Sequence, residues 1–203
     1  MAEPWILILY RAPSEPSTAR VTIWRRLHKL GAIYVGPSAC LLPARLEAGS
    51  ALHDAAEALR QGGGSLDTYT VEAFAQEAEA SLKARYNAAR DAEYAEIVER
   101  AEGVVQELEL EGSRGKYTYA EVEENETALA RLRRLLRRIR GRDIFGATGR
   151  PSAQAAVARA EERLEEFVDL TASREGQNGG PPILHSAVLL DDPTRTHREE
   201  TDE

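Results

Sequence analysis

Residues 5–43 read WILILYRAPSEPSTARVTIWRRLHKLGAIYVGPSACLLP, and this stretch decides the fold because short apolar runs flank a single basic helical segment. The run at 5–10 is too short for a helix and too continuously apolar for an edge strand, so it predicts a strand buried on both faces. The segment between Ser17 or Thr18, either of which can cap a helix, and Gly31 carries apolar side chains at helical spacing. It predicts an amphipathic helix of about three turns with a glycine terminator.

The residues that follow extend this pattern into a complete α+β unit. Residues 32–35 and 39–42 predict two strands joined by a short turn, because Gly, Pro and Ser separate two apolar runs. A second helix over 47–61 and a last strand over 66–71 come next. The resulting order, β-α-β-β-α-β, is typical of a ferredoxin-like fold, in which two helices cover one face of a four-stranded antiparallel sheet. This order predicts a ferredoxin-like domain over 1–73.

The rest of the sequence predicts a helical extension and then a polar segment. Residues 74–171 are rich in Ala, Glu and Arg, which favours about three helices that pack on each other or on a second subunit. These helices are expected at 75–110, with a bend allowed near Gly103, and at 119–140 and 152–171. Residues 172–203 predict a flexible linker and a disordered acidic tail. Within this segment the apolar run 183–190 has two interpretations: a strand that docks on the body of the protein, or the remnant of a lost downstream domain.

Composition indicates a chain without a membrane partner. The formal net charge is −8, which argues against a nucleic-acid coat protein, and no apolar run approaches the 18 or so residues that span a bilayer. The sequence also lacks a basic, cleavable leader, so we expect a cytoplasmic protein. The single cysteine, Cys40, excludes an internal disulfide and is expected in a buried strand, with a redox or oxyanion-sensing thiol as the alternative. Because phosphate-loop, nucleophile-elbow and zinc-protease motifs are missing, we predict no enzymatic activity, no metal and no cofactor.

The strongest chemical signal is RLRRLLRRIRGR at 131–142, where leucine and isoleucine form one stripe and arginine occupies most other positions. Arginine pairs with phosphate in a bidentate manner, so a row of arginines on one helix predicts contact with a DNA or RNA backbone. The alternative is an antiparallel acidic helix that neutralises the arginines through Glu96, Glu99, Glu102, Glu107 and Glu109. The predicted DNA-binding residues are Arg131, Arg133, Arg134, Arg137, Arg138, Arg140 and Arg142.

A smaller basic patch surrounds the first strand and helix. Cations on the outer face of a helix that covers a sheet usually form a solvated surface. The alternative concerns Arg11, which follows a buried strand where loops of this fold gather and where an oxyanion could bind. The members of this patch are Arg11, Arg20, Arg25, Arg26 and Lys29.

Three blocks, WILILYRAP, ARVTIWRRLHKLGAIYVGPSACLLP and YTYAEVEENE followed by LARLRRLLRRIRGRDIFGA, resemble the N-terminal region of ChrB-type chromate-resistance proteins. The resemblance runs in order over about residues 4–170. It implies a regulator that responds to chromate and controls an efflux operon by binding DNA. Members of that family commonly continue into a C-terminal chromate-resistance domain, whereas this sequence continues into a short acidic segment. The first part of the chain also looks similar to the ferredoxin-like module of phenylacetate-type repressors and of a small CRISPR-associated nuclease. Such a nuclease needs a metal-binding carboxylate at the end of the first strand, where this sequence has Tyr10 and Arg11.

These observations predict a cytoplasmic, non-enzymatic transcriptional regulator. Its expected partners are double-stranded operator DNA, bound by the arginine-rich helix, and chromate or another oxyanion as effector. The ferredoxin-like domain would serve as scaffold and as the interface of a homodimer. Two alternatives stay open: a protein interaction module in which glutamates satisfy the arginines, and an oxyanion-handling protein that uses the Cys40 thiol.

Overall fold

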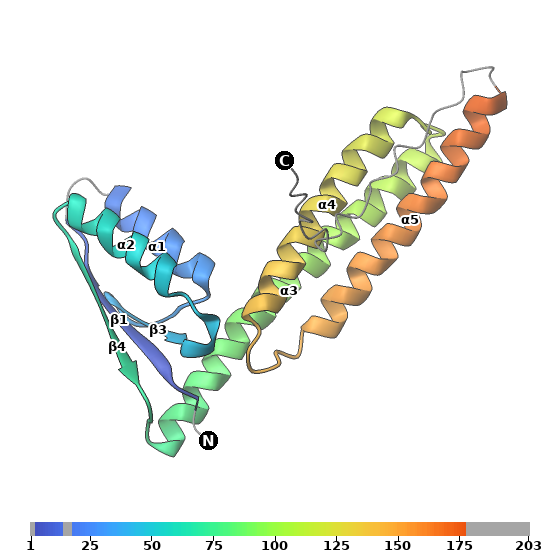
Figure 1. Ribbon diagram of the computed structural model, residues 1–203. Helices are drawn as coiled ribbons and strands as arrows, with labels where there is room; N and C mark the ends of the chain where they lie inside the picture. Colours follow the sequence, from blue (N-terminus) through green and yellow to red (C-terminus); the bar gives the residue numbers. More distant parts are fainter. Residues whose placement is uncertain (1–2, 14–17, 178–203) are drawn as a thin grey trace, which may run out of the picture.

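The computed structural model describes residues 3–13 and 18–177 of the 203-residue chain. Within these ranges the chain forms a sheet unit followed by a bundle of long helices (Figure 1). The predicted order β-α-β-β-α-β is present, and the predicted element boundaries of the sheet unit agree to within two residues. Its elements are β1 (Trp5–Arg11), α1 (Thr18–Leu30), β2 (Ile33–Gly36), β3 (Ala39–Pro43), a 3-10 turn η1 (Ala44–Leu46), α2 (Gly49–Gln61) and β4 (Ser65–Val71).

The four strands form one antiparallel sheet in the order β2-β3-β1-β4, which places β1 in the interior. Leu7 of β1 stands opposite Leu41 of β3 on one side and Tyr69 of β4 on the other. Helices α1 and α2 cover one face of this sheet (Figure 1). The core beneath them is continuous, because Ile8 and Cys40 of the sheet pack with apolar side chains of both helices.

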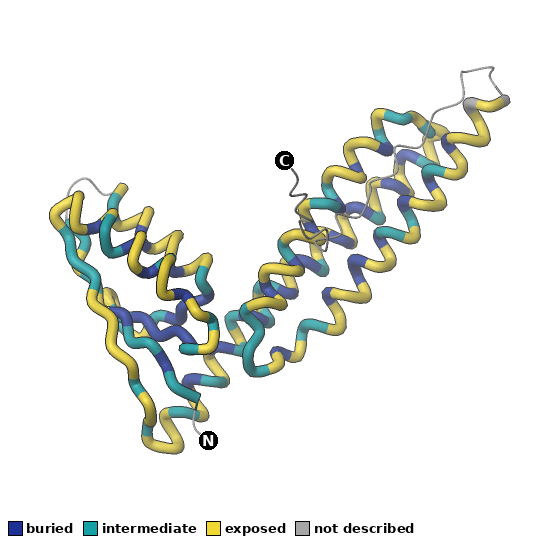
Figure 2. The backbone as a smooth tube through the Cα atoms, viewed as in Figure 1, coloured by how far each residue is buried: buried dark blue, intermediate teal, exposed yellow. Residues whose placement is uncertain are grey.

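The other face of the sheet is covered over only part of its length. Trp5 is buried there against Tyr86 of the following helix and against Phe145, with ring centroids 5.9 and 5.5 Å apart respectively. Leu9 and Tyr69 lie farther along the same face and are exposed. The middle of β4 is exposed as well (Figure 2). The prediction that β1 is buried on both faces is therefore correct near Trp5 and wrong near Leu9, because the covering helix crosses only one end of the sheet.

Three helices form the extension: α3 (Gln76–Ser113), α4 (Tyr119–Arg142) and α5 (Arg150–Gln177). They pack on each other around one apolar core, so the extension is a three-helix bundle rather than an arm that needs a second subunit. Helix α3 continues without interruption through Gly103. None of the helices in the described ranges is long and apolar enough to cross a membrane.

Helix α3 belongs to both parts of the molecule. Leu82 and Tyr86, from its first turns, pack against the sheet. Ile97 and Leu108, farther along the helix, lie in the core of the bundle. The boundary between 73 and 74 stays a prediction, and one continuous helix connects the two sides of it.

The predicted linker begins later than expected, because α5 runs on to Gln177. Thr171 is fully buried, and the guanidinium of Arg174 lies 3.9 Å from the centroid of the Tyr117 ring and donates to the carbonyl of Gly115. These contacts hold the last turns of α5 on the bundle, so the prediction of a linker over 172–177 was wrong. The predicted disordered tail and the apolar run 183–190 lie outside the described residues.

Candidate nucleic-acid interface

Helix α4 carries the arginine-rich sequence, and its start is well defined. Thr118 is the N-cap, and its hydroxyl accepts a hydrogen bond from the backbone N–H of Glu121 at 3.4 Å. This Thr-x-x-Glu arrangement is the sequence signature of a capping box. The first half of α4 is acidic and the second half is basic, which suits the helix dipole at both ends.

One stripe of α4 is buried, as the leucine and isoleucine spacing predicts. Leu129, Leu132, Leu136 and Ile139 all lie in the core of the bundle. Since these positions fix the rotation of the helix about its axis, most arginines between them must point outward. The exposed members are Arg131, Arg133, Arg134, Arg137, Arg138 and Arg140.

Five of these six guanidinium groups make no hydrogen bond or ion pair with another residue in the ranges 3–13 and 18–177. The exception is Arg133, which pairs with Glu161 of α5. The alternative, in which glutamates of α3 neutralise these arginines, finds no ion pair to support it within the described residues. Glu96 bonds to Arg100 on its own helix, and Glu109 lies 3.9 Å from Arg163 of α5.

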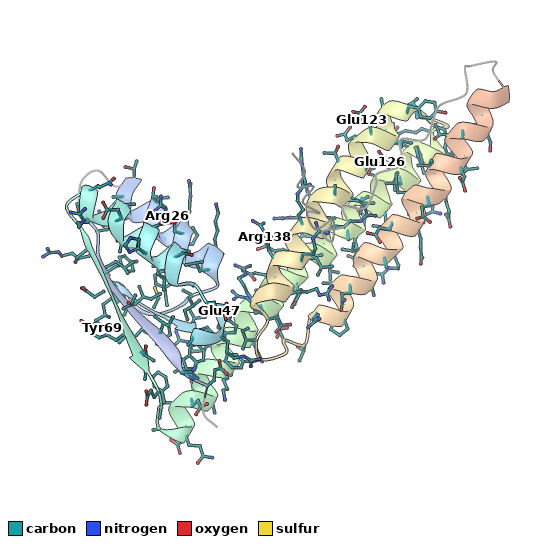
Figure 3. All side chains as sticks on the ribbon, viewed as in Figure 1. Arg26, Glu47, Tyr69, Glu123, Glu126 and Arg138 are labelled. Carbon is teal, nitrogen blue, oxygen red and sulfur yellow. The ribbon has the colours of Figure 1, made fainter. Side chains whose placement is uncertain are left out.

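The unpaired arginines lie close enough together to act on one ligand. Arg131, Arg134, Arg137 and Arg138 line a common surface hollow. Arg138 projects from α4 on the side that looks toward the sheet unit, whereas Glu123 and Glu126 mark the acidic half of the helix (Figure 3). Exposed cations spaced along one face suit a repeated anion such as a phosphodiester backbone. We call Arg131, Arg134, Arg137, Arg138 and Arg140 the arginine surface.

Arg142 differs from the other arginines, and its predicted role in DNA binding is corrected. One guanidinium nitrogen donates to the carbonyls of His28 and Lys29 at 3.1 and 2.7 Å, and the other donates to both carboxylate oxygens of Glu93. Burial lowers the pKa of Arg142, and the Glu93 carboxylate opposes this shift. Because all of its bonds lie at the junction of the sheet unit and the bundle, Arg142 positions α4 against α1.

A second arginine completes this junction. Arg90 of α3 is only 1% exposed, donates to the carbonyl of Gly31 and lies 2.9 Å from Glu93 through its Nε atom. Gly31 has a φ of +87°, and a Cβ atom there would come within 2.6 Å of the Arg90 guanidinium. The glycine thus ends α1 in the left-handed conformation and also leaves room for the arginine.

Sequence analysis missed Arg90 and Glu93, although a signal for them exists. Leu82, Tyr86, Arg90 and Tyr94 are spaced by four residues, so Arg90 falls on the buried stripe of α3. A buried cation needs a partner, and Glu93 stands three residues later, within reach on the same helix.

The smaller basic patch does not form a single anion site. Arg11 ends β1 close to the start of α1, whereas Lys29 lies near the end of α1, about 16 Å farther along the helix axis. Arg26 donates to the backbone carbonyl of Asp54 on α2, and Arg25 is exposed. Trp24, which the spacing places beside the core, is instead 47% exposed and stacks on His28 at 5.2 Å. The α1 surface is therefore basic and aromatic.

Cys40 is buried in β3, as expected. Burial raises the pKa of its thiol to about 11, and the hydrogen bond with Tyr34 lowers it by less. A reactive sensor thiol needs the opposite, a lowered pKa and access to solvent, so the structure does not favour the Cys40 alternative. Within the described ranges no group of three His, Cys, Asp or Glu side chains gathers as a metal site.

Comparison with models of known protein families gives a match over most of the chain. The model of a family described as "Protein ChrB, N-terminal" matches residues 20–178. The match begins within α1 and includes the junction residues and the whole bundle. A search of curated proteins finds no match.

Proposed function

Because the chain belongs to the family of the ChrB N-terminal region, we propose that it acts in chromate resistance as a regulator that binds double-stranded DNA. The observation that carries the proposal is the arginine surface of α4, whose five guanidinium groups lack partners among the described residues. In this proposal the chain binds DNA without catalysing a reaction, and chromate or another oxyanion is its effector. Operator binding implies a cytoplasmic location.

The bundle supports this function by holding the arginines in place. The buried stripe of α4 fixes which way each arginine points, and Arg142 fixes the end of the helix against α1. When these arginines neutralise phosphates, the counterions condensed on the DNA are released. The affinity for DNA therefore depends strongly on salt concentration. We also propose that the sheet unit is ferredoxin-like, because its strand order and its two covering helices support that classification.

The test is a double charge reversal within the arginine surface, Arg134→Glu with Arg138→Glu. We expect binding to a duplex from the region upstream of its own coding sequence to weaken at least about 100-fold at 100 mM salt, since each reversal replaces attraction to phosphate by repulsion. The slope of log affinity against log salt should also fall by about two. Fluorescence anisotropy over a range of NaCl concentrations measures both quantities.

A matched control reverses Arg60 of α2 and Arg100 of α3, which changes the net charge equally but leaves the arginine surface intact. This control should retain most of the affinity. Equal losses in both variants would mean that net charge, rather than this surface, governs binding. Unchanged affinity in the Arg134 and Arg138 variant would refute the proposal outright.

A protein interaction module is the second candidate, and one observation favours it. The uncovered end of the sheet exposes Leu9, Val35 and Tyr69, the last of these to 54%. A homodimer formed through this face would bury these side chains. This homodimer is tested by measuring the molecular mass of the intact protein and of a Tyr69→Lys variant by analytical ultracentrifugation. A dimer formed through this face should dissociate in the variant.

A further inference from the structure

The arginine surface has a candidate ligand within the same chain. Residues 191–203, which lie outside the described residues, read DDPTRTHREETDE and contain six acids against two arginines. We infer that this acidic segment folds back along the bundle and binds the arginine surface, so that it competes with DNA for the same side chains. The inference rests on the proposed function, because it describes how that binding would be regulated.

The length of the chain allows this contact. The end of α5 lies beside the start of α4, because Arg174 bonds to Gly115 and covers Tyr117. From Tyr119, at the start of α4, the arginine surface lies between about 18 Å (Arg131) and 32 Å (Arg140) along the helix. Residues 178–190 can span about 43 Å when extended, so the first acids at 191 reach every member of the surface.

The charges of the bundle select this surface. The acidic first half of α4 includes Glu123 and Glu126, which repel an acidic segment as it leaves the end of α5. The next positive surface along that path is the row from Arg131 to Arg140. Within this row only Arg133 pairs with a carboxylate of the described residues, so the glutamates of the bundle leave the other arginines unneutralised.

A contact of this kind would be weak enough to regulate binding. A single exposed ion pair contributes little to binding, and salt screens it. Attachment to the same chain raises the effective concentration of the acidic segment to the millimolar range, so several weak pairs suffice for occupancy. Duplex DNA carries a denser row of charges and displaces the segment, whereas isolated phosphates do not.

The docking is tested without DNA by NMR on the full chain. A nitroxide placed on Thr194→Cys should broaden the amide signals of 131–140 more than those of 119–126 at 20 mM NaCl. The broadening should disappear at 500 mM NaCl, and also when the six acids become amides. Cys40 is fully buried, which leaves the engineered thiol as the labelling site. Equal broadening of both ranges, or none, would overturn the inference whether or not the protein binds DNA.

Competition is tested with the same amide variant and a duplex probe. We expect it to bind about three- to tenfold more tightly than the unaltered chain at 100 mM NaCl. A control converts six exposed acids of the sheet unit and α3 into amides: Asp54, Asp67, Glu72, Glu77, Glu99 and Glu102. An equal gain in this control would assign the effect to net charge and overturn the competition. If no variant binds DNA, the proposed function and the competition both fail, while the NMR result still decides the docking.

Discussion

At the scale of single residues, Glu93 is the carboxylate that balances two arginines at the junction. Its carboxylate faces Arg90 and Arg142, and these two arginines in turn bond to the carbonyls that end α1. Without the carboxylate, two positive charges would lie side by side with little solvent around them. The glutamate therefore makes it possible for arginine to cap α1.

Glu93→Gln should lower the free energy of unfolding by about 3 kcal/mol, because it keeps the shape of the side chain but removes the charge that balances two partly buried guanidinium groups. Urea denaturation measures the loss. Glu99→Gln changes an exposed glutamate on the same helix and should shift stability by no more than about 0.5 kcal/mol. A Glu93→Gln protein as stable as the Glu99→Gln protein would show that the junction does not depend on this charge.

At the scale of elements, the sequence was sufficient for most of the fold and for part of the site. Helices and strands were predictable because apolar spacing and Gly or Pro punctuation agree along the chain. Ion-pair partners were not predictable, because they depend on how each helix is rotated about its axis relative to its neighbours. The acidic face of α3 therefore suggested neutralisation of α4, whereas its glutamates have other partners or none. Arg142 belongs to the same arginine-rich stretch as Arg138, yet only Arg142 contacts the end of α1.

The end of α5 provides a prediction at this scale. Arg174→Ala removes the cation–π contact with Tyr117 and the hydrogen bond to Gly115. The free energy of local unfolding of residues 172–177 should fall by about 1 kcal/mol. Hydrogen exchange of the amides in the last turns should accelerate about fivefold. Arg159→Ala, at an exposed position on the same helix, serves as control and should leave these rates unchanged. Unchanged exchange in the Arg174 variant would mean that other contacts hold this end.

At the scale of the whole molecule, α3 makes the two parts depend on each other. Its first turns, together with Phe145 from the connection between α4 and α5, cover Trp5 and Leu41 of the sheet. The sheet unit thus buries one end of its second face against residues that follow it in the sequence.

A fragment of residues 1–73 should consequently fail to form a cooperative fold. Uncovering large apolar side chains costs about 1.5–3 kcal/mol each, which is comparable to the total stability of so small a unit. With Trp24→Phe in both proteins, the fluorescence of Trp5 should be shifted to the red in this fragment and not in residues 1–177. A sharp thermal transition with buried Trp5 in the short fragment would contradict this interdependence and support a boundary at 73.

If the chain binds DNA as proposed, the contact between Arg142 and the end of α1 also limits the length of duplex that one chain would contact. The C-terminal ends of α1 and α4 meet there, so their basic surfaces start from a common point. The 13 residues of α1 extend for about 20 Å and the row from Arg131 to Arg140 for about 14 Å. With the step from Arg140 to Arg142 included, the two basic surfaces would together span about 36 Å along the helix axes, which is close to one turn of B-DNA, or about ten base pairs.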